Sequence, residues 1–206
     1  MKKIFIFMLT VAAAAFTLQA RNVHFGFEGG FGISSPHGCS GSGIAYSAAA
    51  RVEYNFSSLS KGWYVASGVG IYGKGWENDI EIAHYQAERT ATAAYLQLPL
   101  MAGYRMPLSS TLSLMIETGP YAAIAVAGSY EDKTYHGANP YIIHSGDCFG
   151  NDAPYRRADI GWTAGVGLTI ASRWLVGLKL ARQFNSFDPE EKKSNFTYGL
   201  SLGCIF

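Results

Sequence analysis

The sequence predicts an all-β protein: an eight-stranded antiparallel up-and-down transmembrane β-barrel preceded by a cleaved signal peptide. Three observations predict this fold class. Apolar residues alternate with small or polar ones along most of the 206 residues, the period-two pattern of strands with two unlike faces. Eight such stretches of ~10–14 residues occur, and a tilted strand crosses a bilayer with ~9–11. Long and short connections alternate between them, as they do in outer-membrane barrels.

The composition agrees with a surface that faces lipid. Charged residues make up only 15% of the chain, while it contains 24 Gly and 13 Tyr. Soluble domains carry about 25% charged residues. The formal net charge of +1 gives no field that would favour nucleic acid as a partner.

The first twenty residues have the pattern of a secretory signal peptide. A Lys-Lys pair follows the initial Met, an apolar run occupies 4–16, and Leu18-Gln19-Ala20 is a cleavage site. We expect residues 1–20 to be removed on export, which leaves 21–206 as one outer-membrane β-barrel domain. An uncleaved anchor helix is the alternative, although the run is short for a span of ~20 residues.

The first four expected strands show the alternation in order. In 22–33 the apolar face is Val23, Phe25, Phe27, Phe31 and Ile33. In 44–56 it is Ile44, Tyr46, Ala48, Ala50, Val52, Tyr54 and Phe56. In 63–74 it contains Val65, Val69 and Ile71, and in 93–104 Leu96, Leu98, Leu100 and Tyr104. Gly, Ser and charged residues lie between them, so we expect the apolar face to contact lipid.

The last four strands repeat the pattern. In 112–126 the apolar face contains Leu112, Leu114, Ile116, Ile124 and Val126. In 158–170 it is Ile160, Trp162, Ala164, Val166, Leu168 and Ile170, and in 174–184 Trp174, Val176, Leu178 and Leu180. In 195–206 it is Phe196, Tyr198, Leu200, Leu202, Cys204 and Phe206. A soluble barrel would instead place its apolar residues inside.

The connections alternate in length. Long loops are expected at 34–43, 76–90, 128–157 and 185–194. Short turns are expected at 57–61, 106–110 and 171–173. Outer-membrane barrels have long external loops and short periplasmic turns, and an even strand number places both ends in the periplasm.

The last strand resembles the C-terminal insertion signal of bacterial outer-membrane barrels. Its terminal aromatic and the alternating apolar residues before it are Tyr198, Leu200, Leu202 and Phe206. The resemblance implies that the barrel insertion machinery binds this strand, and that outer-membrane lipid surrounds the folded protein.

Three further segments are similar to the PorT-like outer-membrane β-barrel family. They are Tyr95-Leu-Gln-Leu-Pro-Leu100, Glu117-Thr-Gly-Pro-Tyr121 and Asp159-Ile-Gly-Trp-Thr-Ala-Gly165. Gln97 stands where that family often has Glu. The resemblance covers about 22–206 and implies an integral outer-membrane barrel. It implies no single activity, although the family's namesake is linked to protein secretion.

Several charged residues fall on the face that points into the barrel. They are Glu28, Arg51, Glu53, Lys74, Glu117, Asp159 and Lys179. Side chains just fill an eight-stranded barrel, so charges there must pair or keep water. One interpretation is a structural polar plug, and the other is a narrow gated path for ions or small solutes.

Catalytic and metal-binding patterns are weak. His24 and Glu28 share one face with Ser47, which suggests a hydrolase trio, but no nucleophile motif flanks them and they point inward. The loop histidines His37, His84, His136 and His144 lack ligand spacing. We therefore expect no catalytic site, metal or cofactor.

Two cysteines lie in external loops of an exported chain. Cys39 is in the first and Cys148 in the third. Export leads to an oxidising compartment, where the two cysteines can form a disulfide. The alternative is that they remain two separate thiols. Cys204 lies mid-strand on the lipid face, where we expect it to act as a small apolar residue.

The longest loop, 128–157, is rich in aromatic and charged residues. It contains Tyr130, Tyr135, Tyr141, Tyr155, Glu131, Asp132, Lys133, Asp147, Asp152, Arg156 and Arg157. Such loops on a rigid scaffold suit contact with a partner. The sequence thus predicts a non-enzymatic envelope scaffold whose external loops bind a surface partner. A narrow channel and an outer-membrane lipid-processing enzyme are the alternatives.

Overall fold

The computed structural model describes residues 22–206 except 38, 83–84, 137–138, 150–154 and 188–192. The expected signal peptide, 1–20, lies outside the described residues. The strands are β1 (Val23–Ser34), β2 (Gly41–Asn55), β3 (Gly62–Ile82), β4 (Tyr85–Pro107), β5 (Leu112–His136), β6 (Asn139–Asp147), β7 (Ala158–Ile170), β8 (Trp174–Gln183) and β9 (Phe196–Ile205).

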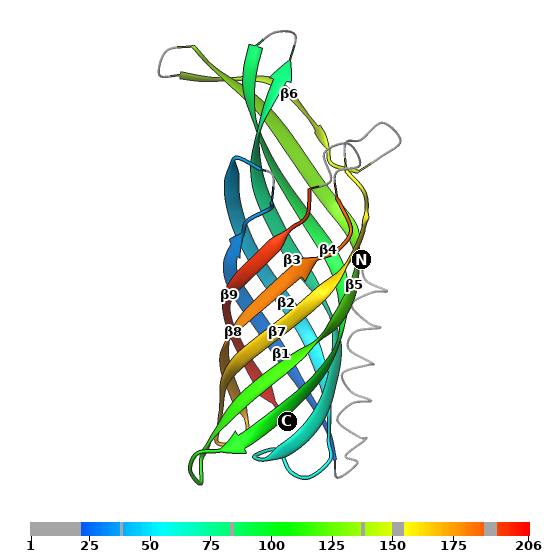
Figure 1. Ribbon diagram of the computed structural model, residues 1–206, viewed down its shortest axis with the longest axis vertical. Helices are drawn as coiled ribbons and strands as arrows, with labels where there is room; N and C mark the ends of the chain where they lie inside the picture. The colour runs from blue at the N-terminus through cyan, green and yellow to red at the C-terminus, as the bar shows by residue number, and fades with distance from the viewer. Residues whose placement is uncertain (1–21, 38, 83–84, 137–138, 150–154, 188–192) are drawn as a thin grey trace, which may run out of the picture.

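Eight of these strands close into a ring, which confirms the predicted fold class. Each ring strand pairs antiparallel with its sequence neighbours, except that β5 pairs with β7 and β6 lies outside the ring beside β5. Pairing of β9 with β1 closes the ring, as in Phe31↔Leu200 (Figure 1). Closure leaves no unpaired sheet edge inside the membrane, where a free backbone group is costly.

The lipid-facing residues are those expected from the alternation. All the large apolar side chains at the alternate positions of β9 are exposed on the outside, for example Leu200 at 64%. On β7 and β8 this face runs from Ile160 to Ile170 and from Trp174 to Phe184. Ten residue steps of ~3.3 Å at a tilt of ~40° give a band about 25 Å tall. That height matches the hydrocarbon core that such barrels cross.

Aromatic residues mark both borders of this band. At the end with short turns, exposed rings come from Tyr54, Phe56, Trp63, Tyr104, Trp174 and Phe206. The ring centroids of Trp63 and Tyr104 are 5.1 Å apart. At the other end, exposed rings come from Tyr46, Trp162, Phe184, Phe196 and Tyr198. Such girdles lie at the two membrane–water interfaces.

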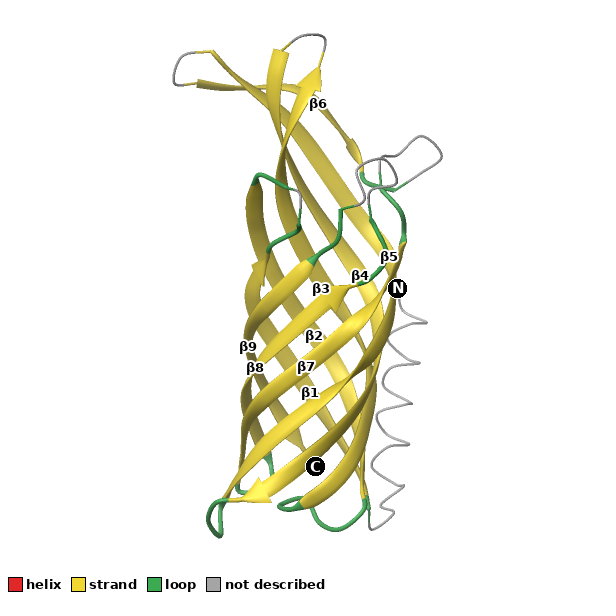
Figure 2. Cartoon of the chain, in the orientation of Figure 1, coloured by secondary structure: helices red, strands yellow, loops and turns green. Residues whose placement is uncertain are grey.

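Two regions expected to be loops are mostly strand. β3 continues to Ile82 and β4 begins at Tyr85, so 76–90 is a hairpin. β5 continues to His136 and pairs with β6, so much of 128–157 is a second hairpin. Both segments contain many polar and charged residues. We call residues 77–90 and 129–147 the projecting sheet; its strands rise above the ring, while loops close the opposite end (Figure 2).

No helix among the described residues is long and apolar enough to cross a membrane.

Candidate functional site

Two regions of the molecule gather polar side chains, the barrel lumen and the projecting sheet. The lumen is layered along the barrel axis. Its layer at the short-turn end is apolar, formed by the buried residues Tyr64, Ala66, Met101, Met115, Leu175 and Ile205. Arg105 and Glu53 lie level with this layer, since they pair with Met115 and Ala66, and the other charged residues lie above it.

Arg51 is the centre of the lumen charge network. Its guanidinium lies 2.6 Å from Glu117 Oε2, 2.7 Å from Glu53 Oε1 and 3.1 Å from Glu28 Oε2. Lys179 Nζ joins the network from β8, 2.5 Å from Glu28 Oε1 and 3.1 Å from Glu117 Oε1. Five of the seven inward charges expected from the sequence therefore meet in one cluster.

Arg105 also belongs to this network, although the sequence analysis missed it. It is fully buried, and its guanidinium lies 2.8 Å from Glu53 Oε2 and donates to Thr169 Oγ1 at 3.0 Å. The fourth strand was expected to end at 104, but β4 runs to Pro107. The alternation places Met101 and Gly103 inside the barrel. Continued by two residues, it would also have predicted that Arg105 points inward.

The network is electrically balanced. Arg51, Arg105 and Lys179 face three carboxylates, those of Glu28, Glu53 and Glu117. The Tyr64 hydroxyl donates to Glu117 Oε2 at 3.0 Å, and its ring lies 4.2 Å from the Arg105 guanidinium. A buried charge is tolerated when it is paired and hydrogen-bonded, so this arrangement is that of a structural plug.

Lys74 and Asp159 form a separate pair nearer the mouth. Lys74 Nζ donates to Asp159 Oδ2, and the Tyr121 hydroxyl donates to Asp159 Oδ1 at 3.1 Å. The ammonium also lies 5.1 Å from the centre of the Tyr95 ring. This second site again matches one cation with one anion, so the lumen has no net charge that would select an ion.

An apolar cluster covers the mouth of the barrel. The Trp76 ring lies 4.9 Å from Phe187 and 5.2 Å from Tyr155, which come from the β8–β9 and β6–β7 connections. Cys148 and Phe149 complete the cover with Tyr95 and three alanines of β4 and β5. This cluster covers the external end of the lumen, and the apolar residues around Tyr64 pack at the other end.

The two external cysteines lie in the same cluster. Cys148 is completely buried, and Cys39 packs against the cluster that contains it. The structure has no disulfide between them in its described part. Burial raises the pKa of the Cys148 thiol to about 12, so the reactive thiolate is scarce at neutral pH while this thiol stays covered. Cys204 lies on β9 with a half-buried side chain.

The projecting sheet contrasts with the lumen in its charge. Residues 77–90 and 129–147 include seven acidic and two basic side chains, a formal charge of −5. Both cations are already engaged: Lys133 Nζ lies 3.3 Å from Glu131 Oε2, and Arg89 binds Asp132 through two hydrogen bonds of 2.6 and 2.8 Å. These hydrogen bonds raise the pKa of Arg89 above its ordinary value. The guanidinium lies 4.4 Å from the Tyr130 ring, which in turn contacts His144.

The suggested hydrolase trio does not assemble. Glu28 is bound to Arg51 and Lys179, and within the described residues it forms no hydrogen bond to His24. His24 lies opposite Glu53, whereas Ser47 lies opposite Gly30. Six residue steps along β1 separate the two levels by about 20 Å.

The expected loop histidines do not converge. His37 bridges to Ser194, and His144 belongs to β6. His136 ends β5, and His84 lies outside the described residues. Among the residues that the structure describes, no group of three His, Cys, Asp or Glu could hold a metal ion.

The expected insertion-signal residues share one face of the last strand. Tyr198, Leu200, Leu202 and Phe206 all point outward and are exposed. β9 carries them between β1 and β8, so they form part of the lipid-facing wall in the folded barrel.

Several solved structures resemble the chain. Ail, the attachment invasion locus protein of Yersinia pestis, in complex with the heparin analogue sucrose octasulfate, is 13% identical with a TM-score of 0.45, over 90% of this chain and 99% of that one. The outer membrane enzyme PagL is 13% identical with a TM-score of 0.47, over 86% and 97%. Neisserial surface protein A is 9% identical with a TM-score of 0.43, over 89% and 97%.

These structural similarities show the fold alone. A comparison with protein-family models identifies the family. No curated protein sequence matches the chain. The model of the family described as "Outer membrane protein beta-barrel domain" matches residues 13–189, which is most of the chain. Together with the closed ring and its apolar outer face, the match places the protein in the outer membrane. The chain belongs to the outer membrane protein beta-barrel domain family.

Proposed function

We propose that the protein is a non-enzymatic envelope scaffold whose projecting sheet binds a positively charged surface partner. The observation that carries this proposal is the excess of acidic side chains on the sheet, seven against two. Asp79, Glu131 and Asp147 are exposed there. A patch of one sign steers an oppositely charged partner toward it and penalises partners of the same sign.

The sheet is also a suitable platform for a partner. β3, β4 and β5 continue without interruption from the barrel wall into it, so the membrane part fixes its position. The Arg89–Asp132 hydrogen bonds and the stacked Tyr130 ring join β4 to β5 above the ring. A partner that binds such a preformed surface loses little free energy in ordering it.

The lumen geometry favours this function over conduction and catalysis. Its charges are paired and its two ends are covered by apolar side chains. A gated path would need both layers to move and the ion pairs to separate, which costs several kcal/mol for each buried pair. We therefore assign the lumen network a structural role.

Three further assignments complete the proposal. Within its family the chain is a PorT-like member, on the three segments that resemble that group. Residues 1–20 are a signal peptide and 21–206 the barrel domain. The outward face of β9, Tyr198, Leu200, Leu202 and Phe206, is the segment that the barrel insertion machinery recognises.

We also propose that Cys39 and Cys148 form a disulfide in the oxidising compartment. The support is that Cys39 packs against the cluster that contains Cys148. The bond would fasten the first external loop to the β6–β7 connection across the mouth. Unboiled gel mobility with and without reductant tests it. A shift on reduction that Cys39→Ser abolishes is expected, and equal mobilities would contradict the bond.

Trimming one hairpin at a time tests the binding surface. Asn78 pairs with Arg89, so replacing 79–88 by Asn-Gly shortens the first hairpin and removes three acidic residues. Lys133 pairs with Ile142, so replacing 134–141 by Asn-Gly is a matched control that removes none. Both trims keep Cys148, Phe149 and Tyr155, which cover the mouth.

The probe is a fluorescent decalysine peptide added to the refolded protein in vesicles. Three acidic charges at ~0.5 kcal/mol each predict about tenfold weaker binding after the first trim. The control trim should leave the affinity within about twofold. Equal affinities of both trims and the full chain would contradict the proposal. Heat-modifiable gel mobility verifies that each barrel is folded.

A further inference from the structure

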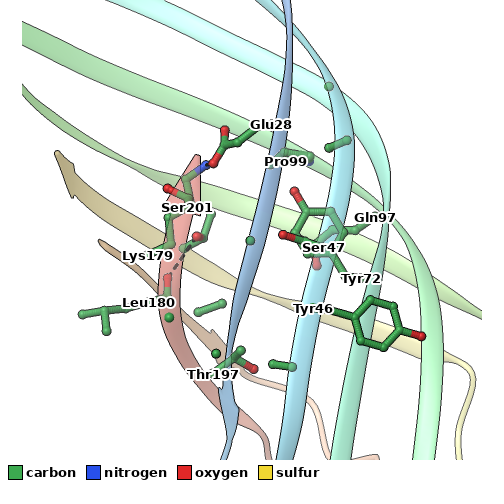
Figure 3. Close-up of a pocket in the computed structure, with 18 of the residues that line it drawn as sticks. Glu28, Tyr46, Ser47, Tyr72, Gln97, Pro99, Lys179, Leu180, Thr197 and Ser201 are labelled. Carbon is green, nitrogen blue, oxygen red and sulfur yellow. Dashed lines mark hydrogen bonds and ion pairs between the residues drawn. The ribbon is translucent and has the colours of Figure 1, made fainter. Parts of the chain in front are cut away.

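A cavity of about 100 Å³ lies inside the barrel, separate from the projecting sheet. Polar side chains from seven strands line it, among them Glu28, Ser47, Tyr72, Gln97, Lys179 and Ser201 (Figure 3). Gly30, Ala45 and Ala49 leave the room, since larger inward side chains would fill it. A water needs at least ~10–15 Å³ by such a measure, so a molecule of several non-hydrogen atoms fits.

Two of the lining polar groups are buried and available for a ligand. Gln97 is 4% exposed and Ser201 is 6% exposed. Within the described part of the chain, neither side chain donates or accepts a hydrogen bond, and both line the cavity. A buried amide or hydroxyl is nearly always hydrogen-bonded. The Gln97 amide offers two donors and an acceptor, and a hydroxyl offers one donor and two acceptors.

The charged residues at the cavity wall are paired, partly with carboxylates that lie beyond the cavity, such as Glu117 and Asp159. Lys179 and Glu28 pair at 2.5 Å, and the Lys179 side chain is 27% exposed. An ammonium has three donors, and contacts to Glu28 and Glu117 account for two of them. A neutral ligand oxygen suits the third donor, whereas a charged ligand would disturb the balanced network.

The outer end of the cavity lies close to the exterior. Thr197 lines the cavity and is level with Ser34, the last residue of β1. Asn195 covers this end: its Oδ1 accepts hydrogen bonds from Ser34 at 2.9 Å and from Thr197 at 3.4 Å.

We propose that this cavity binds a small neutral polyhydroxylated molecule, of the size of a polyol or a monosaccharide. The wall offers mixed donors and acceptors, and every charge on it is paired, as neutral hydroxyl groups require. Its glycine and alanine surface suits the C–H groups between those hydroxyls. The site is independent of the projecting sheet, so its failure would leave the proposed function standing.

Saturation-transfer NMR on the refolded full chain in micelles tests the site with three probes: glycerol, glucose and laurate. Glycerol or glucose should receive saturation from the protein. Gln97→Leu combined with Ser201→Val should reduce that signal at least tenfold, because it removes the free amide and hydroxyl. Thr92→Val is the matched control, since Thr92 lies on β4 with an exposed side chain.

Each outcome decides the proposal. Signal on glycerol or glucose that survives Thr92→Val and disappears in the double variant supports it. Signal that persists in the double variant overturns it, and so does the absence of signal, which would leave only water in the cavity. Signal on laurate alone would also overturn it, because the cavity would then take an acyl chain. Heat-modifiable mobility of the double variant verifies folding.

Discussion

The lumen and the projecting sheet of this barrel use charge in opposite ways. In the lumen, three cations face three carboxylates around Arg51, and Lys74 faces Asp159. On the sheet, seven acidic side chains accompany two basic ones, and several are exposed. Buried charges without partners would cost several kcal/mol each, whereas exposed charges in water cost little. The lumen charges therefore hold the barrel together, and the sheet charges remain available for a partner.

Glycines of the barrel wall make room for the tyrosine rings that bind the lumen carboxylates. A Cβ at Gly103 would overlap the Tyr64 ring, and one at Gly161 would overlap the Tyr121 ring. These two tyrosines are the ones that donate to Glu117 and Asp159. The high Gly and Tyr content thus reflects rings that lie over glycines while they reach the buried carboxylates.

Removing the central carboxylate should produce the largest loss of stability. Glu117→Leu leaves Arg51 and Lys179 with fewer partners inside the barrel, at an expected cost of about 3–5 kcal/mol. Urea unfolding in vesicles measures it. Glu131→Gln on the same strand is exposed and should change stability by less than about 0.5 kcal/mol. A similar loss of unfolding free energy in both variants would show that the lumen ion pairs contribute no more to stability than an exposed charge.

A smaller loss is expected from filling the glycine beneath Tyr64. Gly103→Ala pushes the ring away from Glu117, and such overpacking costs about 1–3 kcal/mol. Gly165→Ala is the control, because its Cβ would have no neighbour nearer than 3.4 Å. Urea unfolding should separate the two alanine variants. Equal midpoints would mean that Tyr64 moves without cost.

The smallest expected effect is on conductance. With apolar layers at both ends of the lumen, the protein in a planar bilayer should give no single-channel steps. Glu117→Gln and Lys179→Met should leave this result unchanged, provided gel mobility shows folded barrels. Reproducible steps that change in amplitude with either substitution would instead support the gated path.

The sequence could predict the barrel because the alternation in each membrane strand is imposed by lipid. Leu96 and Leu98 face out and Gln97 faces in, as the period requires. The same rule did not reveal the strands within 76–90 and 128–147, since polar and charged residues interrupt the alternation there. It missed Arg105 because the fourth strand was expected to end at 104, three residues before the end of β4.

The sequence alone does not predict contacts between distant segments. The alternation placed Arg51, Glu117 and Lys179 inside, but their convergence depends on strand order and register across the ring. Neither Tyr155 nor Phe187 has a pattern that predicts their packing on Trp76, because all three come from different connections or strand ends. The internal cavity likewise follows from where small residues of β1 and β2 align.

One paired measurement tests the contrast between the two regions most directly. The affinity for decalysine and the urea midpoint are compared for a sheet variant, Glu77→Gln/Asp79→Asn/Glu131→Gln, and a lumen variant, Glu117→Gln. The sheet variant should bind about tenfold more weakly with an unchanged midpoint. The lumen variant should bind normally and unfold at lower urea. A sheet variant that binds like the unmodified protein, or a lumen variant of undiminished stability, would contradict this contrast.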